Sequence, residues 1–204
     1  MDRFEELERL LALRCPTLEL RRDEPMSRHT SFHVGGPVRL MALPKTAGEA
    51  KAALLSAKEL DLDPFFLGNG TNLLVPDRGA ERFLIKPAGK YSVGSLNRVW
   101  EANGLLCAGA AVSLANLAGC ALGRSLTGLE FAQGIPGSVG GGVTMNAGAY
   151  GGELAQVLDS VTVLDKAGQE HTFSAGQCGL GYRRSIFSGG DYLILAARFR
   201  LEPG

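Results

Sequence analysis

The stretch that decides the fold runs from Gly134 to Gly152 and reads GIPGSVGGGVTMNAGAYGG. Eight of its nineteen residues are glycine. A glycine-rich turn that leads into a short helix exposes unpaired N–H groups, which favour phosphate. The apolar residues that interrupt the glycines are Ile135, Val139, Val143 and Met145. Because such side chains favour burial, we expect a packed segment that binds a ligand rather than a flexible surface loop.

A second glycine loop lies upstream, between two apolar segments. Residues 68–72 read GNGTN, and the glycines let successive amide N–H groups converge on an anion. We predict that this loop binds pyrophosphate, although an ordinary tight turn explains the same residues. It is not a Walker loop, because no Gly-Lys-Ser/Thr follows, and Leu73 occupies the third glycine position of the dinucleotide fingerprint.

The composition is that of a globular protein and argues against several classes. The chain has 204 residues, 28 of them glycine, with 21 acidic and 21 basic residues and 45% hydrophobic residues. This apolar content argues against a disordered chain, and the absence of excess Lys and Arg argues against a nucleic-acid partner. The longest apolar stretches are far short of the roughly 20 residues of a membrane-spanning helix. The start of the chain is charged and the cysteines form no C-x-x-C pair, so we expect a cytoplasmic protein without a metal site.

Local patterns divide the chain into two subdomains, residues 1–89 and 90–204. In the first we expect a helix capped by Asp2, a hairpin of residues 30–34 and 38–43, a helix capped by Thr46, and strands at 65–67, 73–75 and 83–86. In the second we expect a hairpin of residues 99–102 and 105–108, a helix started by Ser113, and strands at 161–165 and 193–201. The predicted fold class is therefore α+β, with a small α/β unit followed by an antiparallel-sheet unit.

Several motifs together resemble the UDP-N-acetylenolpyruvoylglucosamine reductases, which are flavoenzymes of peptidoglycan synthesis. The matching segments, in the family's order and spacing, are residues 28–36, 68–74, 128–131, 134–153 and 181–187. The resemblance implies a PCMH/VAO-like fold in which FAD lies between two subdomains. In that family a third, substrate-binding domain follows, and this sequence stops at about the point where it should begin. We therefore expect an FAD-binding fragment or a short homologue, with little or no turnover alone.

The resemblance also implies roles for individual residues. Those implied to contact FAD are Gly68, Asn69, Gly70, Thr71, Asn72, Leu73, Gly134, Ile135, Pro136, Gly137, Ser138, Val139, Asn146, Ala147 and Gly148. The family's reductant is NADPH, and its substrate is a UDP-sugar enolpyruvyl ether that receives hydride from the flavin. Hydride transfer leaves enolate character beside a carboxylate, which requires a fixed cation and a proton donor. The resemblance implies Arg183 as that cation and Tyr182 as a substrate contact, and it places the proton donor in the third domain.

Two other interpretations remain open at this point. One is a flavin oxidase of the same fold, in which histidine often attaches FAD covalently, although none of the chain's three histidines lies in a glycine loop. The other is a non-catalytic module that binds FAD or another nucleotide and regulates a partner. An intact Tyr182-Arg183-Arg184-Ser185 motif would be unnecessary in such a module. No sequence pattern indicates an oligomeric state.

Overall fold

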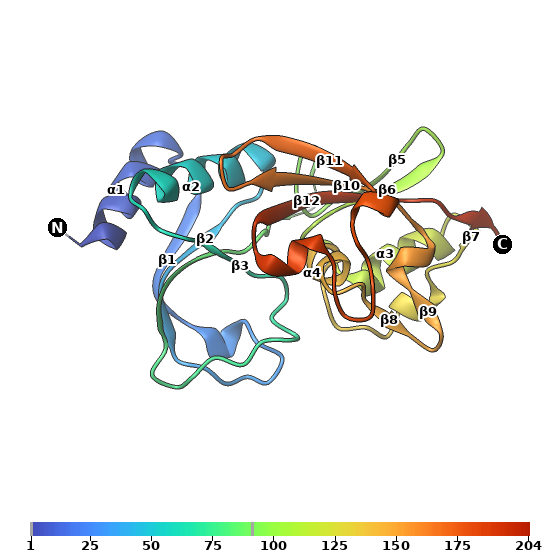
Figure 1. The fold of residues 1–204 in the computed structure, drawn as a ribbon, viewed down its shortest axis with the longest axis horizontal. Helices are drawn as coiled ribbons and strands as arrows, with labels where there is room; N and C mark the ends of the chain where they lie inside the picture. Colours follow the sequence, from blue (N-terminus) through green and yellow to red (C-terminus); the bar gives the residue numbers. More distant parts are fainter. Residues whose placement is uncertain (1, 91) are drawn as a thin grey trace.

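The computed structural model describes residues 2–90 and 92–204, whose helices and strands form two main sheets (Figure 1). The helices are α1 (Arg3–Arg14), α2 (Ala47–Glu59), α3 (Leu114–Leu122) and α4 (Val139–Thr144). The strands are β1 (Glu19–Pro25), β2 (Pro37–Leu43), β3 (Phe65–Phe66), β4 (Ala80–Ile85), β5 (Val99–Ala102), β6 (Leu105–Gly109), β7 (Leu126–Thr127), β8 (Gly148–Ala149), β9 (Gly152–Glu153), β10 (Leu158–Asp165), β11 (Glu170–Ser174), β12 (Tyr192–Phe199) and β13 (Glu202–Pro203).

The first sheet combines antiparallel and parallel pairing. Its order among the described residues is β1-β2-β4-β3, with β1 antiparallel to β2 and both β2 and β3 parallel to β4. Helices α1 and α2 cover one face, where Leu7, Leu11 and Leu54 pack against Phe83 and Ile85. The other face is covered by loops, and its buried residues are Met26, Val38, Met41, Leu43, Leu67, Val75 and Leu84.

Two strands predicted in this unit are wrong. Residues 30–34 form a turn, because the hydroxyl of Thr30 donates to the carbonyl oxygen of Val34 at 2.8 Å and His33 has a φ of 54°. The strand that pairs with β2 is instead β1, whose charged side chains are tolerated because it lies at the edge of the sheet. Residues 73–75 also form no strand, since the chain turns away there to cover the sheet.

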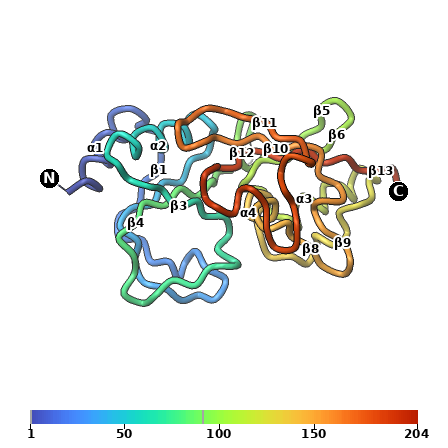
Figure 2. The backbone as a smooth tube through the Cα atoms, in the orientation of Figure 1, coloured from blue at the N-terminus to red at the C-terminus, as the bar shows by residue number. Residues whose placement is uncertain are grey.

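The second sheet is antiparallel throughout, as predicted. Its order among the described residues is β11-β10-β12-β6-β5. The predicted hairpin of β5 and β6 is confirmed, and Asn103 and Gly104 take the positive φ values of 53° and 74° that a two-residue turn requires. Helices α3 and α4 lie on one side of this sheet (Figure 2) and share a core with it.

The helices begin at the predicted capping residues. Asp2 Oδ1 accepts from the amide of Phe4 at 3.1 Å, and Thr46 Oγ1 accepts from Glu49 at 3.2 Å. Ser113 starts α3 in the same way. Each such cap stabilises a protein by about 1 kcal/mol. None of the helices in residues 2–90 and 92–204 is long and apolar enough to cross a membrane.

The hydrophobic core of the first sheet extends into the second. Leu164 of β10, together with Leu193 and Leu195 of β12, belongs to the same buried cluster as Leu7 of α1 and Leu54 of α2. The subdomain boundary predicted at residues 88–90 falls between the strands of the two sheets and stays a prediction. The two sheets therefore meet through packed apolar side chains.

Candidate functional site

The loop of residues 68–72 begins at the carboxyl ends of two parallel strands. It follows β3 and Leu67, whose amide donates to the carbonyl oxygen of Ile85 at 3.0 Å. Gly70 has a φ of +64°, and a Cβ placed on it would lie 1.9 Å from the carbonyl oxygen of His29. The carbonyl of Gly70 also accepts a hydrogen bond from the amide of Ser31 at 3.2 Å. Only glycine fits this position, and the loop is held against residues 29–31.

The amide groups of this loop are free to bind a ligand. Within the described part of the chain, the N–H groups of residues 68–72 make no hydrogen bond, and neither do those of Gly137 and Ser138. Consecutive unpaired amides of this kind form a concave site for an anion. A phosphate would satisfy donors that the fold itself leaves without partners.

The two glycine segments predicted to bind FAD lie against each other. A Cβ placed on Gly68 would lie 2.8 Å from Oγ of Ser138, and one on Gly137 would lie 3.9 Å from Oγ1 of Thr71. Asn72 Nδ2 lies 3.9 Å from the sulfur of Met145. The 68–72 loop of the first subdomain therefore lies close to both ends of α4.

Helix α4 is fixed in place by its own residues. Ser138 Oγ accepts from the amide of Gly141 at 3.3 Å, and Val139 and Val143 are completely buried. Ala147 is also buried in this core. The side chains of Val139 and Ala147 therefore point away from any ligand, and these two residues can contact a cofactor only through their backbone.

The remaining predicted cofactor residues differ in exposure. Ile135 and Leu73 are half-buried and pack against the cores of the two sheets. Gly134, Pro136 and Asn69 are exposed. The exposed residues border open space, whereas Ile135 and Leu73 hold the turns in place.

A small hollow lies at the other end of α4. Its volume is about 260 Å³, and its lining includes Asn146, Gly148, Tyr182 and Arg183, all predicted site residues. The side chain of Asn146 donates to the carbonyl oxygen of Gly181 at 3.2 Å. This hydrogen bond brings together the residues predicted for cofactor and for substrate.

The loop that carries Arg183 is fastened to α4. The hydroxyl of Ser185 donates to the carbonyl oxygen of Thr144 at 2.7 Å, and that of Ser188 donates to the same oxygen at 3.0 Å. The side chains of Tyr182 and Arg183 are themselves exposed. In the described residues, the guanidinium of Arg183 makes no ion pair or hydrogen bond. Its charge is therefore available to a ligand.

Strained backbone gathers around the same hollow. Of the eight described non-glycine residues with positive φ, Asn146, Tyr150 and Arg183 line it, with φ values of 43°, 53° and 55°. Such conformations cost about 1–3 kcal/mol each and cluster at functional sites. Sequence reasoning did not select Tyr150, Glu153 or Gln156, which also line the hollow. The Glu-x-x-Gln spacing of a capping box was the only local signal for Glu153 and Gln156.

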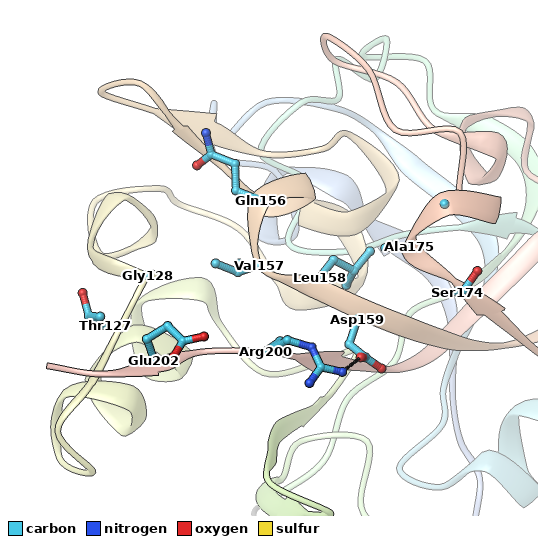
Figure 3. Close-up of a pocket in the computed structure, with 11 residues that line it drawn as sticks. Thr127, Gly128, Gln156, Val157, Leu158, Asp159, Ser174, Ala175, Arg200 and Glu202 are labelled. Carbon is cyan, nitrogen blue, oxygen red and sulfur yellow. Dashed lines mark hydrogen bonds and ion pairs between the residues drawn. The ribbon is translucent and has the colours of Figure 1, made fainter.

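A larger hollow of about 510 Å³ shares Gln156 with the small hollow but contains none of the predicted residues (Figure 3). It lies between residues 127–128, residues 156–159 and the 174–176 turn, and Arg200 pairs there with Asp159 at 2.5 Å. Because that charge pair is satisfied internally and the amides of residues 68–72 are not, the glycine loops are the stronger candidate for a cofactor.

Comparison with known proteins finds a matching family and relatives of similar sequence. The family described as FAD binding domain matches residues 38–174. UDP-N-acetylenolpyruvoylglucosamine reductase of Alkaliphilus oremlandii is 41% identical over 182 residues, which are 89% of this chain and 58% of that protein. The same-named protein of Clostridium kluyveri is 38% identical over 204 residues, 100% of this chain and 65% of that protein. The chain thus spans about three fifths of the length of these relatives.

Solved structures are similar over nearly the whole chain. The UDP-N-acetylenolpyruvylglucosamine reductase from Thermus caldophilus has a TM-score of 0.76 at 32% identity and covers 91% of this chain and 63% of its own. Glucooligosaccharide oxidase from Acremonium strictum has a TM-score of 0.68 at 16% identity, covers 96% of this chain and 42% of its own, and shares the fold alone. These matches confirm the predicted α+β, PCMH/VAO-like fold, whose cofactor is FAD.

Proposed function

Because the chain belongs to the FAD binding domain family and its relatives there are UDP-N-acetylenolpyruvoylglucosamine reductases, we propose that it carries the FAD site of such a reductase. The proposed reaction is the NADPH-dependent reduction of a UDP-sugar enolpyruvyl ether in peptidoglycan precursor synthesis. We propose a cytoplasmic location and a small-molecule substrate, with no nucleic-acid partner. The relatives at 38–43% identity are reductases, so we favour this proposal over a flavin oxidase or a purely regulatory module.

The observation that carries the proposal is the meeting of the two glycine segments. The unpaired amides of residues 68–72 would bind the pyrophosphate, together with those of Gly137 and Ser138. Residues 146–148, at the far end of α4, would then lie toward the flavin. FAD, when bound, supplies the chemistry of hydride transfer, and the protein supplies position and charge.

Arg183 would stabilise the charge that develops on the substrate. Its guanidinium is exposed beside the small hollow and has no carboxylate partner in the described residues. The left-handed backbone of Arg183, together with the two serine hydrogen bonds to Thr144, fixes where its side chain begins. A cation held in this way stabilises an enolate carboxylate without having to be reorganised during the reaction.

Binding of FAD is tested by titration of the purified chain. We expect a shift of the visible flavin bands and quenching of flavin fluorescence. If neither change appears at tens of micromolar protein, the chain does not hold FAD and the proposal is wrong. Flavin that stays with the protein after acid precipitation would instead support a covalent flavin oxidase.

Arg183→Ala tests whether the site performs reduction. We expect FAD binding to be unchanged, because the side chain is exposed. In a full-length version that also carries the third domain, reoxidation of the reduced flavin by the enolpyruvyl substrate should slow by about 100-fold, the usual effect of removing one group that stabilises a developing charge. Arg184→Ala is the matched control, since Arg184 is an exposed neighbour that does not line the hollow. An undiminished rate in Arg183→Ala would favour a binding module.

A further inference from the structure

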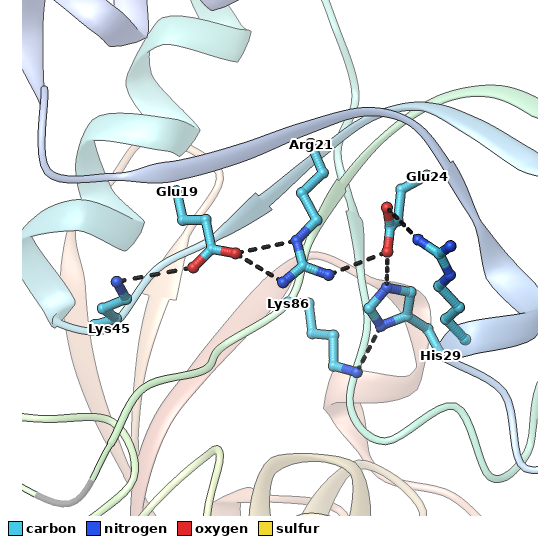
Figure 4. Close-up of polar contacts among 7 residues, drawn as sticks. Glu19, Arg21, Glu24, His29, Lys45 and Lys86 are labelled. Carbon is cyan, nitrogen blue, oxygen red and sulfur yellow. Dashed lines mark hydrogen bonds and ion pairs between the residues drawn. The ribbon is translucent and has the colours of Figure 1, made fainter.

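A polar cluster has no part in the roles assigned so far (Figure 4), and its residues are Glu19, Arg21, Glu24, Arg28, His29, Lys45 and Lys86. Its centre is His29, whose Nε2 lies 2.8 Å from Oε1 of Glu24 and whose Nδ1 lies 3.1 Å from Nζ of Lys86. An ammonium group can only donate, so Nδ1 is the acceptor and the proton of the neutral imidazole is on Nε2. Glu24, only 6% exposed, accepts that proton's hydrogen bond.

Lys86 is the one basic residue of this cluster that makes no ion pair with a carboxylate in the described part of the chain. Glu24 pairs with Arg21 at 3.1 Å and with Arg28 at 3.9 Å, whereas Lys86 has no carboxylate within ion-pair distance in the described residues. Its ammonium uses one of three donors, on His29. Burial lowers the pKa of Lys86 and the charge of Arg21 lowers it further, while the charge of Glu24, a smaller effect, opposes them without reversing the direction. A half-buried cation that lacks a counter-ion is costly unless an anion binds beside it.

The position of Lys86 relates it to the predicted pyrophosphate loop. Lys86 directly follows β4, and Leu67 directly follows the parallel neighbour β3, with the amide of Leu67 bonded to Ile85. The side chain of Lys86 and the 68–72 loop therefore start at the same edge of the sheet. In open sheets, ligands bind at the carboxyl ends of parallel strands.

His29 links the ammonium to the loop itself. Its ring accepts a hydrogen bond from Lys86. Its backbone carbonyl oxygen lies only 1.9 Å from the position that a Cβ on Gly70 would take. Only one residue therefore separates the unpaired cation from the row of unpaired amides. The amides offer dipoles but no full charge, whereas a pyrophosphate carries negative charge that the loop alone does not neutralise.

We propose that Lys86 is a cofactor-binding residue whose ammonium supplies the fixed positive charge for the pyrophosphate of FAD, and that Glu24 and His29 position it. This inference rests on the proposed function, because it takes FAD as the ligand of residues 68–72. None of the described residues that line the Arg183 hollow belongs to this cluster, so we assign the cluster to cofactor binding and not to hydride transfer.

Two substitutions separate charge from structure. Lys86→Gln removes the charge but keeps an N–H donor for His29, and Lys86→Arg keeps the charge. Lys58→Met is the control, because it removes an exposed lysine from α2, on the opposite face of the sheet. Lys86→Met serves as a second uncharged variant if Lys86→Gln does not fold, as judged by circular dichroism.

The readout is the Kd for FAD from fluorescence titration. We expect about a 10- to 100-fold weaker Kd in Lys86→Gln, the effect of losing one hydrogen bond to a charged group. Lys86→Arg should lose much less, and Lys58→Met nothing. Raising NaCl from about 20 mM to about 500 mM should shrink the ratio of the mutant Kd to the wild-type Kd, because salt screens the attraction between lysine and phosphate.

The possible failures are distinguishable. If the unchanged chain does not bind FAD, the proposed function fails and this inference fails with it. If the chain binds FAD but Lys86→Gln binds it equally well, only the role of Lys86 is wrong. A weakened Kd whose ratio to wild type does not change with salt would mean that Lys86 acts only as a structural support for His29, which also overturns the inference.

Discussion

Replacing Gly70 by alanine measures how strictly the 68–72 loop is fixed. A residue with a Cβ at a φ of +64° costs about 1–2 kcal/mol. The new Cβ would also lie 1.9 Å from the carbonyl oxygen of His29, so the loop must move by about 1 Å to reach the 3.0 Å that real Cβ contacts respect. That movement breaks the hydrogen bond from Ser31 to Gly70, which contributes about 1 kcal/mol. We expect the free energy of unfolding to fall by about 2–3 kcal/mol and Tm by about 5–10 °C.

Gly104→Ala is the matched control for this experiment. Gly104 has a similar φ of +74° in the turn between β5 and β6, but nothing lies within 4 Å of its would-be Cβ. It should therefore lose only the backbone contribution, about 1–2 kcal/mol, and keep its affinity for FAD. Gly70→Ala should bind FAD at least about tenfold more weakly, since its amides no longer point at one position. Equal Tm values and equal FAD affinities in the two variants would refute the reasoning.

Three further predictions follow from single side chains. Ser138→Ala should lower Tm by about 2–4 °C in a thermal melt, because α4 loses its cap, worth about 1 kcal/mol. Burial lowers the pKa of His29 below its ordinary 6.5 and outweighs the opposing effect of the hydrogen bond to Glu24. As the pH falls, the unfolded chain therefore takes up a proton at His29 before the folded chain does. Stability should therefore fall as pH drops below 6.5, and His29→Gln should flatten that part of a plot of Tm against pH. Burial raises the pKa of the Cys178 thiol to about 11, so iodoacetamide should label half-exposed Cys120 well before Cys178, as mass spectrometry would show.

The features of the fold that depend on neighbouring residues could be predicted from the sequence. The caps at Asp2, Thr46 and Ser113 involve side chains and amides two or three residues apart, and Asn103-Gly104 defines its own turn. Such short-range signals keep their meaning wherever the segment lies in the fold.

The strand errors had a tertiary cause. Residues 30–34 carry β-forming side chains, but their backbone forms a turn that lies against Gly70. In this turn the hydroxyl of Thr30 donates to the carbonyl oxygen of Val34. The segment of β1 is rich in charge, but it pairs with β2 along its length, and its place at the sheet edge leaves its charged side chains room to form ion pairs, such as Arg21 with Glu19 at 2.7 Å. Neither fact can be known before the sheet order is known.

The candidate site was only partly predictable, because some of its residues are continuous in sequence and others come together only when the chain folds. The glycine loops are continuous in sequence and were found from it. Tyr150 lies within the 134–152 stretch, but only the folded chain shows its left-handed backbone and its place in the lining of the hollow. Lys86 is separated from His29 by 57 positions, and no local pattern links the two residues. Contacts of this kind emerge only from the folded chain.

The shared core between the two sheets has a consequence for how a cofactor is exchanged. Because Leu164, Leu193 and Leu195 are packed with α1 and α2, separating the sheets would expose that core to water. We therefore expect the chain to unfold in one cooperative transition, and we expect the two halves not to swing apart about a hinge. We then expect FAD, if the 68–72 loop holds it as proposed, to enter and leave by rearrangement of that loop and its neighbours, so the rate of cofactor release would report on local loop opening and not on global stability.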